Sequence, residues 1–104
     1  MNASLEIAKQ AVHDKLESRI RTAEAKLEAL KARAEVAKAN LEIKAIVALL
    51  PKKQVIQQKL EELKNLGADR WEQAKTDLER RIAEFEQSVK ALESKAKELK
   101  AKAT

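Results

Sequence analysis

The 104-residue sequence has no cysteine and no tyrosine, and it has one each of glycine, proline, tryptophan, phenylalanine and histidine. Without cysteine there is no disulfide framework, no thiolate zinc site and no thiol nucleophile. A sheet needs turns and aromatic or β-branched pairs, and both are scarce, so β-structure is close to excluded. A single glycine is also too few for a Gly-rich phosphate-binding loop.

Long apolar runs are missing as well. The longest covers six residues, 45–50, whereas a membrane span needs about 20. The N-terminus has no basic start followed by an apolar stretch, so no signal peptide is apparent. Together with the absence of cysteine, this predicts a soluble, cytoplasmic protein.

What the sequence does contain is charge and helix-forming residues. Charged residues make up 38% of the chain, and alanine, glutamate, lysine, leucine and arginine dominate. Such a composition is typical of long helices. The 22 lysines and arginines exceed the 17 acids by 5, and the two signs are interleaved, which mostly serves solubility. We expect one all-α domain over residues 1–104.

Two apolar seams have coiled-coil spacing, with alternating gaps of three and four residues. The first consists of Leu16, Ile20, Ala23, Leu27, Leu30, Ala34, Ala37 and Leu41, and the second of Ile82, Phe85, Val89, Leu92, Ala96, Leu99 and Ala103. Trp71, Ala74 and Leu78 lead into the second seam, and Leu5, Ala8 and Val12 lead into the first.

The helical pattern is interrupted at two places. Pro51 predicts a kink or short break. At the second place, Gly67 can be the left-handed residue that ends one helix, and Asp69 can cap the next, with Glu72 completing a capping box. Since turn residues flank only the second place, we expect a helix over 3–66, a turn at 66–69 and a helix over 69–103.

In this topology the second helix covers residues 32–66 and leaves the apolar seam of residues 3–31 exposed. The simplest partner for that seam is a second copy of the chain. We therefore predict a long antiparallel coiled-coil helical hairpin that assembles as a dimeric helical bundle. The alternative is a reversal at Pro51. The segment 43–56 favours the longer helix, because it is apolar on most sides and should be enclosed by several neighbours.

Residues 26–92 resemble a family of small bacterial coiled-coil proteins from cyanobacteria and proteobacteria, sometimes described as stress-response proteins. The similar segments are KLEALKARAEVAKANLEIKAI, KLEELKNLGADRWEQAKTDLERRI and the Ala/Lys-rich tail. The resemblance implies a long helix joined to a shorter one through residues 60–75, and a stress-related role. It implies no catalytic residues, and Pro51 departs from the family pattern.

We predict no catalytic, cofactor-binding or metal-binding residues, and therefore a protein that is not an enzyme. His13 has no cysteine or second histidine beside which to bind a metal, so we expect a surface or seam-edge residue. Trp71 is expected to pack beside the turn, under Leu63 and Leu66. The pair Glu61–Glu62 is expected to lie on a solvated face, since adjacent helical residues point in different directions.

The functional hypothesis is a self-associating coiled-coil protein with a structural, scaffold, adaptor or stress-related role, whose partner is itself or another protein's helix. The alternative is a peripheral module that binds an anionic membrane or nucleic acid. Its basic residues would be Lys52 and Lys53 and the tail lysines Lys90, Lys95, Lys97, Lys100 and Lys102. Acids interleave that tail, which favours the first hypothesis.

Overall fold

The computed structural model describes residues 3–103, and it describes the side chains of residues 6–98. Over the described residues the chain forms three helices and no strand: α1 (Ala3–Val36), α2 (Asn40–Leu63) and α3 (Ala68–Ala103). The predicted all-α class is confirmed. The side chains of the predicted seam residues Leu5, Leu99 and Ala103 and of the tail lysines Lys100 and Lys102 lie outside the described ones.

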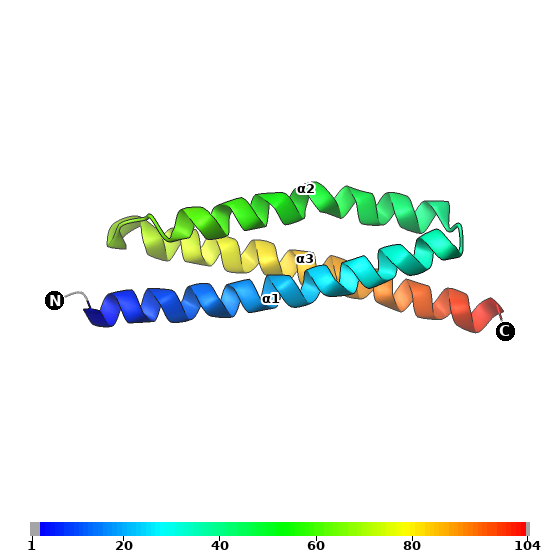
Figure 1. Ribbon diagram of the computed structural model, residues 1–104, viewed down its shortest axis with the longest axis horizontal. Coiled ribbons are helices and arrows are strands. Elements are labelled where there is room, and N and C mark those ends of the chain that lie inside the picture. The colour runs from blue at the N-terminus through cyan, green and yellow to red at the C-terminus, as the bar shows by residue number, and fades with distance from the viewer. Residues whose placement is uncertain (1–2, 104) are drawn as a thin grey trace.

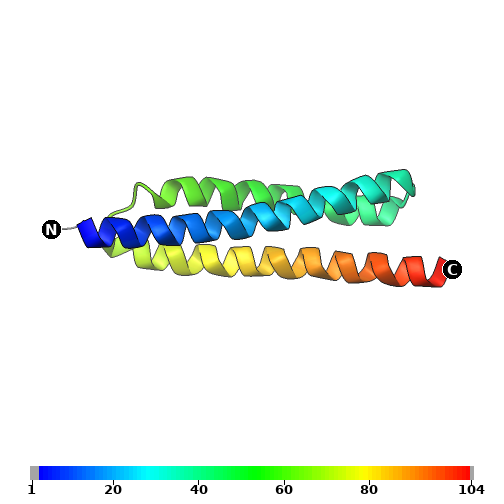
Figure 2. The same ribbon diagram turned by 60° about the horizontal axis from the view of Figure 1, so that its bottom comes forward.

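The three helices lie side by side along their length and form an elongated bundle of 61 × 20 × 17 Å (Figures 1 and 2). α1 and α3 run in the same direction, and α2 runs antiparallel to both. The start of α1 therefore lies at the same end as the connection 64–67, and the end of α3 lies near the connection 37–39.

The first reversal, at residues 37–39, is not the one that the sequence predicted. Lys38 has a φ of 55°, in the left-handed region. The amide of Ala39 donates to the carbonyl of Ala34 at 2.9 Å, and the amide of Lys38 donates to that of Glu35 at 3.2 Å. This pair of hydrogen bonds is the Schellman ending of a helix, in which glycine usually occupies the left-handed position. Here that position holds a lysine, so the end of the helix carries no glycine signal.

This reversal corrects the expected topology. The continuous helix over 3–66 is wrong, and the chain does not form a two-helix hairpin. Pro51 neither ends nor reverses a helix, because it lies exposed within α2. From Leu16 to Ala34 the seam of α1 is covered within the same molecule by α2 and α3, so this part of the chain is not an unpaired arm. The predicted seam residue Ala8 is exposed, and the side chain of Leu5 lies outside the described residues. The buried part of this seam therefore needs no second copy to cover it.

The second reversal lies at residues 64–67, overlapping the predicted turn at 66–69. Its detailed chemistry differs from the expectation. Gly67 does not have a positive φ. Its carbonyl accepts hydrogen bonds from the amides of Arg70 at 3.1 Å and Trp71 at 2.9 Å, so Gly67 stands at the position before α3. Asp69, expected as the cap, lies inside the first turn, where its negative charge is favourable near the helix N-terminus.

One core runs along the bundle axis and draws on all three helices. Its alanines, Ala23 and Ala34, let the helices approach closely. The predicted seams supply most of this core, up to Ala34 on α1, whereas Leu41 is 82% exposed. The buried apolar residues are Leu16, Ile20, Ala23, Leu27, Leu30, Ala34, Ile46, Leu49, Ile56, Leu60, Leu63, Trp71, Leu78, Ile82, Phe85 and Val89.

Polar contacts on the surface link α1 to both other helices. Arg19 donates to both carboxylate oxygens of Glu86 on α3, and this pairing raises the pKa of the Arg19 guanidinium. Gln57 on α2 donates to Glu24 at 2.8 Å. Within single helices, ion pairs join Glu17 to Arg21 and Asp77 to Arg81. Hydrogen bonds from Arg81 and Arg80 lower the pKa of Asp77.

Candidate functional site

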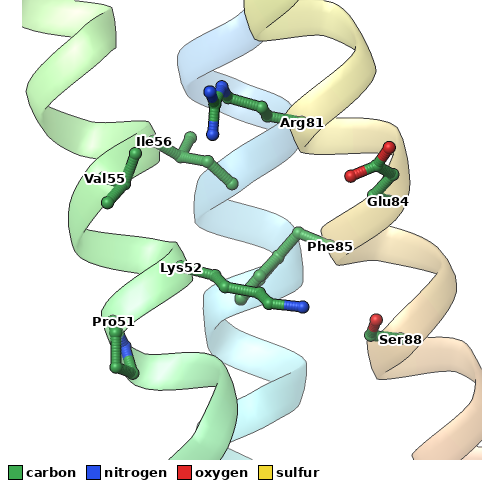
Figure 3. A pocket seen from close by; sticks show the side chains of 8 residues that line it. All are labelled: Pro51, Lys52, Val55, Ile56, Arg81, Glu84, Phe85 and Ser88. Atoms are coloured by element: carbon green, nitrogen blue, oxygen red, sulfur yellow. The ribbon is translucent and has the colours of Figure 1, made fainter.

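A half-open hollow of about 220 Å³ lies between α2 and α3 (Figure 3). Its lining is mainly apolar, with Phe85 from α3 opposite residues of α2, and the side chain of Lys52 extends across it past Phe85. The hollow has room for an apolar side chain, and the charged residues Lys52, Arg81 and Glu84 lie around it. The lining residues are Pro51, Lys52, Val55, Ile56, Arg81, Glu84, Phe85 and Ser88.

The outer face of α2 continues this apolar surface along the helix. Leu41, Ala48 and Val55 are spaced by seven residues, so they lie in one row. All three are exposed, as are Val47 and Pro51 beside the row. We call these five residues the α2 stripe. The segment 43–56 is thus enclosed on one side only: Ile46, Leu49 and Ile56 are buried in the bundle, and the stripe faces solvent.

A second hollow, of about 420 Å³, lies between α1 and α3 and is polar. Arg19, Lys26, Lys90 and Lys97 supply its positive charges. Glu86 and Glu93 lie among them, and Glu86 is paired with Arg19. We call this second hollow the groove between α1 and α3. The acids reduce its positive charge, but the net charge of the lining stays positive and attracts anions. Of the predicted basic residues, Lys90 and Lys97 line this groove, whereas Lys52 lies at the first hollow.

His13 lies in the interior rather than at the surface or the seam edge, where we expected it. The residue is 5% exposed, and neither ring nitrogen has a hydrogen-bond partner among the described residues. Leaving a buried polar group unpaired costs about 1–3 kcal/mol. Its Nδ1 atom lies 3.5 Å from Asp14 Oδ1 and 3.6 Å from Glu17 Oε2. Both distances exceed those of a normal hydrogen bond.

Trp71 is buried near the start of α3, in the same core as Leu63, and Leu66 packs against that core. The Nζ of Lys75 lies 5.6 Å from the centre of the indole ring, within the range of a cation–π contact. This placement agrees with the packing role expected for Trp71. Glu61 and Glu62 are exposed, as expected of a solvated face.

Two features of the folded chain were not predicted from the sequence. One is the cluster that His13 forms with Asp14 and Glu17, the acids one and four residues further on. The other is the exposed side of the segment 43–56, whose apolar character predicted complete enclosure, although a helix at the edge of a bundle can show the same pattern. The spacing of Leu41, Ala48 and Val55 was the available signal for the stripe.

No family model, curated protein or solved structure matches this chain. The resemblance to bacterial coiled-coil proteins stays a prediction. Among the described residues, none of the helices combines the length and the apolar character that a membrane crossing requires.

Proposed function

We propose that this protein is a non-enzymatic helical bundle that self-associates through the α2 stripe and acts as a structural scaffold or adaptor. The observation that carries the proposal is the stripe itself, where Leu41 is 82%, Val47 48% and Val55 38% exposed. Exposed apolar side chains gathered on one side of a helix are typical of interaction sites. The sequence predicted self-association through the apolar seam of α1. We propose the α2 stripe instead, because α2 and α3 cover that seam from Leu16 to Ala34.

A second copy fits the stripe by symmetry. In an antiparallel two-fold arrangement centred on Ala48, Leu41 of each copy lies opposite Val55 of the other, because both are seven residues from the centre. Leu41 then enters the hollow beside Pro51, Val55 and Phe85, and the symmetry fills two hollows at once. The small side chain of Ala48 lets the helices approach at the centre. The contact is about 21 Å long, so we expect a weak dimer.

The charges beside the stripe give the dimer a recognisable salt dependence. In this register Lys44 lies opposite Lys52 of the second copy. Their aliphatic stems can cover the apolar contact while the ammonium groups remain in water, but the two charges repel each other. Salt screens that repulsion, so we expect the association to strengthen as the ionic strength rises.

Sedimentation equilibrium tests the proposal over about 1 µM to 1 mM, the range in which a small interface dissociates. Wild-type protein should change from monomer to dimer. Leu41→Gln should raise the dissociation constant at least tenfold, because the symmetry removes two buried leucines, each contributing about 1.5–3 kcal/mol. Val36→Gln is the matched control: Val36 is 87% exposed at the same end of the bundle but lies outside the stripe. A monomer at every concentration, or equal weakening by both substitutions, would contradict the proposal.

The groove between α1 and α3 supports a second candidate function, the binding of an anionic membrane or nucleic acid. Its lysines would contact phosphates, and such binding weakens as salt rises, opposite to the dimer. Replacing Lys26, Lys90 and Lys97 by glutamine should abolish retention on anionic vesicles or duplex DNA at low salt. Replacing Lys31, Lys44 and Lys59, which do not line the groove, is the control. Failure of the wild type to bind at low salt would end this candidate.

A further inference from the structure

The cluster of His13, Asp14 and Glu17 on α1 has the donor atoms of a metal site. One ligand atom from each residue lies within 4.8 Å of the other two. His13 and Glu17 are one helical turn apart, so their side chains share a face of α1. Asp14 follows His13 directly, and its carboxylate reaches the same cluster from the edge of that face. The helix backbone therefore holds the three donors together without help from a loop.

The buried imidazole is a second, independent indication of a ligand. The side chain of His13 is 7% exposed, and its Nδ1 is directed at the two carboxylates without a hydrogen bond to either. The distances of 3.5 Å and 3.6 Å suit two ligands of one ion. Metal–ligand bonds of about 2.0–2.2 Å in a tetrahedral site place neighbouring donors roughly 3.3–3.6 Å apart.

Neighbouring side chains already orient the two carboxylates. The guanidinium of Arg21 binds Oε1 of Glu17, which leaves Oε2 facing the imidazole. Gln10 donates to Asp14 Oδ1 at 2.9 Å. Such outer contacts fix ligand orientation in metal sites. Asp14 is largely exposed, so an ion can reach the cluster from solvent and water can complete its coordination.

We propose that His13, Asp14 and Glu17 bind a divalent first-row transition metal of the zinc type, through His13 Nδ1 and one oxygen of each carboxylate. Coordination through Nδ1 places the ring proton on Nε2 and provides a partner for one of the two unpaired nitrogens. The imidazole selects against magnesium and calcium, which prefer oxygen ligands alone. With three protein ligands and no bond to Nε2, the site binds more weakly than four-ligand structural zinc sites.

His13 is the only histidine of the chain, so its imidazole resonances report directly on this site. In an NMR titration, zinc should shift those resonances to saturation, whereas magnesium at the same concentrations should not. Thermal unfolding provides a second readout, because a ligand that binds the folded chain raises Tm with its concentration. We expect zinc, and not magnesium, to raise it.

Three variants make the test specific. Glu17→Gln and Asp14→Asn alter side chains outside the core, and each should weaken zinc binding at least tenfold. Glu28→Gln removes the same charge as Glu17→Gln from an exposed position on the same helix and should leave the affinity unchanged. The proposal is overturned if zinc leaves the His13 resonances in place, or if the Glu17 and Glu28 variants bind zinc equally well.

Discussion

Replacing Phe85 with alanine is expected to lower the free energy of unfolding by about 3–5 kcal/mol, the largest loss that we predict for a single residue. Phe85 is 1% exposed and is one of the two aromatic residues of the core, on α3. Its ring also forms the floor of the hollow beside α2, so its removal widens that hollow into the interior. Total stabilities of small domains are about 5–15 kcal/mol, so this loss leaves a marginal fold.

Chemical denaturation followed by circular dichroism measures this loss. Phe85→Leu is the matched variant, because it keeps an apolar side chain in the same place and should cost less than about 1.5 kcal/mol. A loss below 1 kcal/mol for Phe85→Ala, on the order of a surface substitution, would show that Phe85 does not hold α2 and α3 together.

Replacing Pro51 with alanine is expected to raise the free energy of unfolding by about 1–3 kcal/mol. Pro51 lies within α2, where it has no amide to donate to the carbonyl of Val47 four residues earlier. Because Pro51 is on the exposed side, water can reach that carbonyl, and the helix continues. Alanine restores the hydrogen bond and has the highest helix propensity.

The measurement is again denaturation, at a concentration low enough to keep the chain monomeric, since Pro51 belongs to the α2 stripe. Gln54→Ala, also exposed on α2, is the control and should change the stability by less than about 0.5 kcal/mol. If Pro51→Ala destabilised the protein by more than the control, α2 would not be continuous through this position.

The heptad seams were predictable from the sequence because a narrow apolar row is a strong signal of helix packing. Leu16 to Ala34 and Ile82 to Val89 lie buried as their spacing indicates. The reversal at Lys38 was not predictable from residue type, because lysine in a left-handed position carries no turn signal. The packing of α1 on α2 offsets the conformational cost of the left-handed backbone at Lys38, and this packing is known only from the folded molecule.

One available signal was a change of phase in the apolar pattern. Continued beyond Ala34, the α1 seam passes through Leu41 and Ala48, which are exposed. The core of α2 instead uses Ile46, Leu49 and Ile56. Such a change indicates a new helix with its own core face. The candidate sites were harder to foresee, because burial of His13 and exposure of Leu41 both follow from which faces meet in the bundle.

The reversal at residues 37–39 underlies both proposals, since it directs the α2 stripe outward and packs α1 beside the other helices. Spin labels on cysteines introduced at positions 24 and 57 test it most directly, in a sequence that has no cysteine of its own. Glu24 and Gln57 are in contact although 33 residues separate them. Diluting the labelled protein with unlabelled protein restricts the measured distances to those within one molecule.

The three-helix bundle predicts the shortest label separation, because the side chains at positions 24 and 57 are in contact. A continuous helix would place the two positions about 50 Å apart, and a reversal at Pro51 about 30 Å apart, at a rise of 1.5 Å per residue. A dominant distance at about 50 Å would contradict the fold and, with it, the outward position of the α2 stripe.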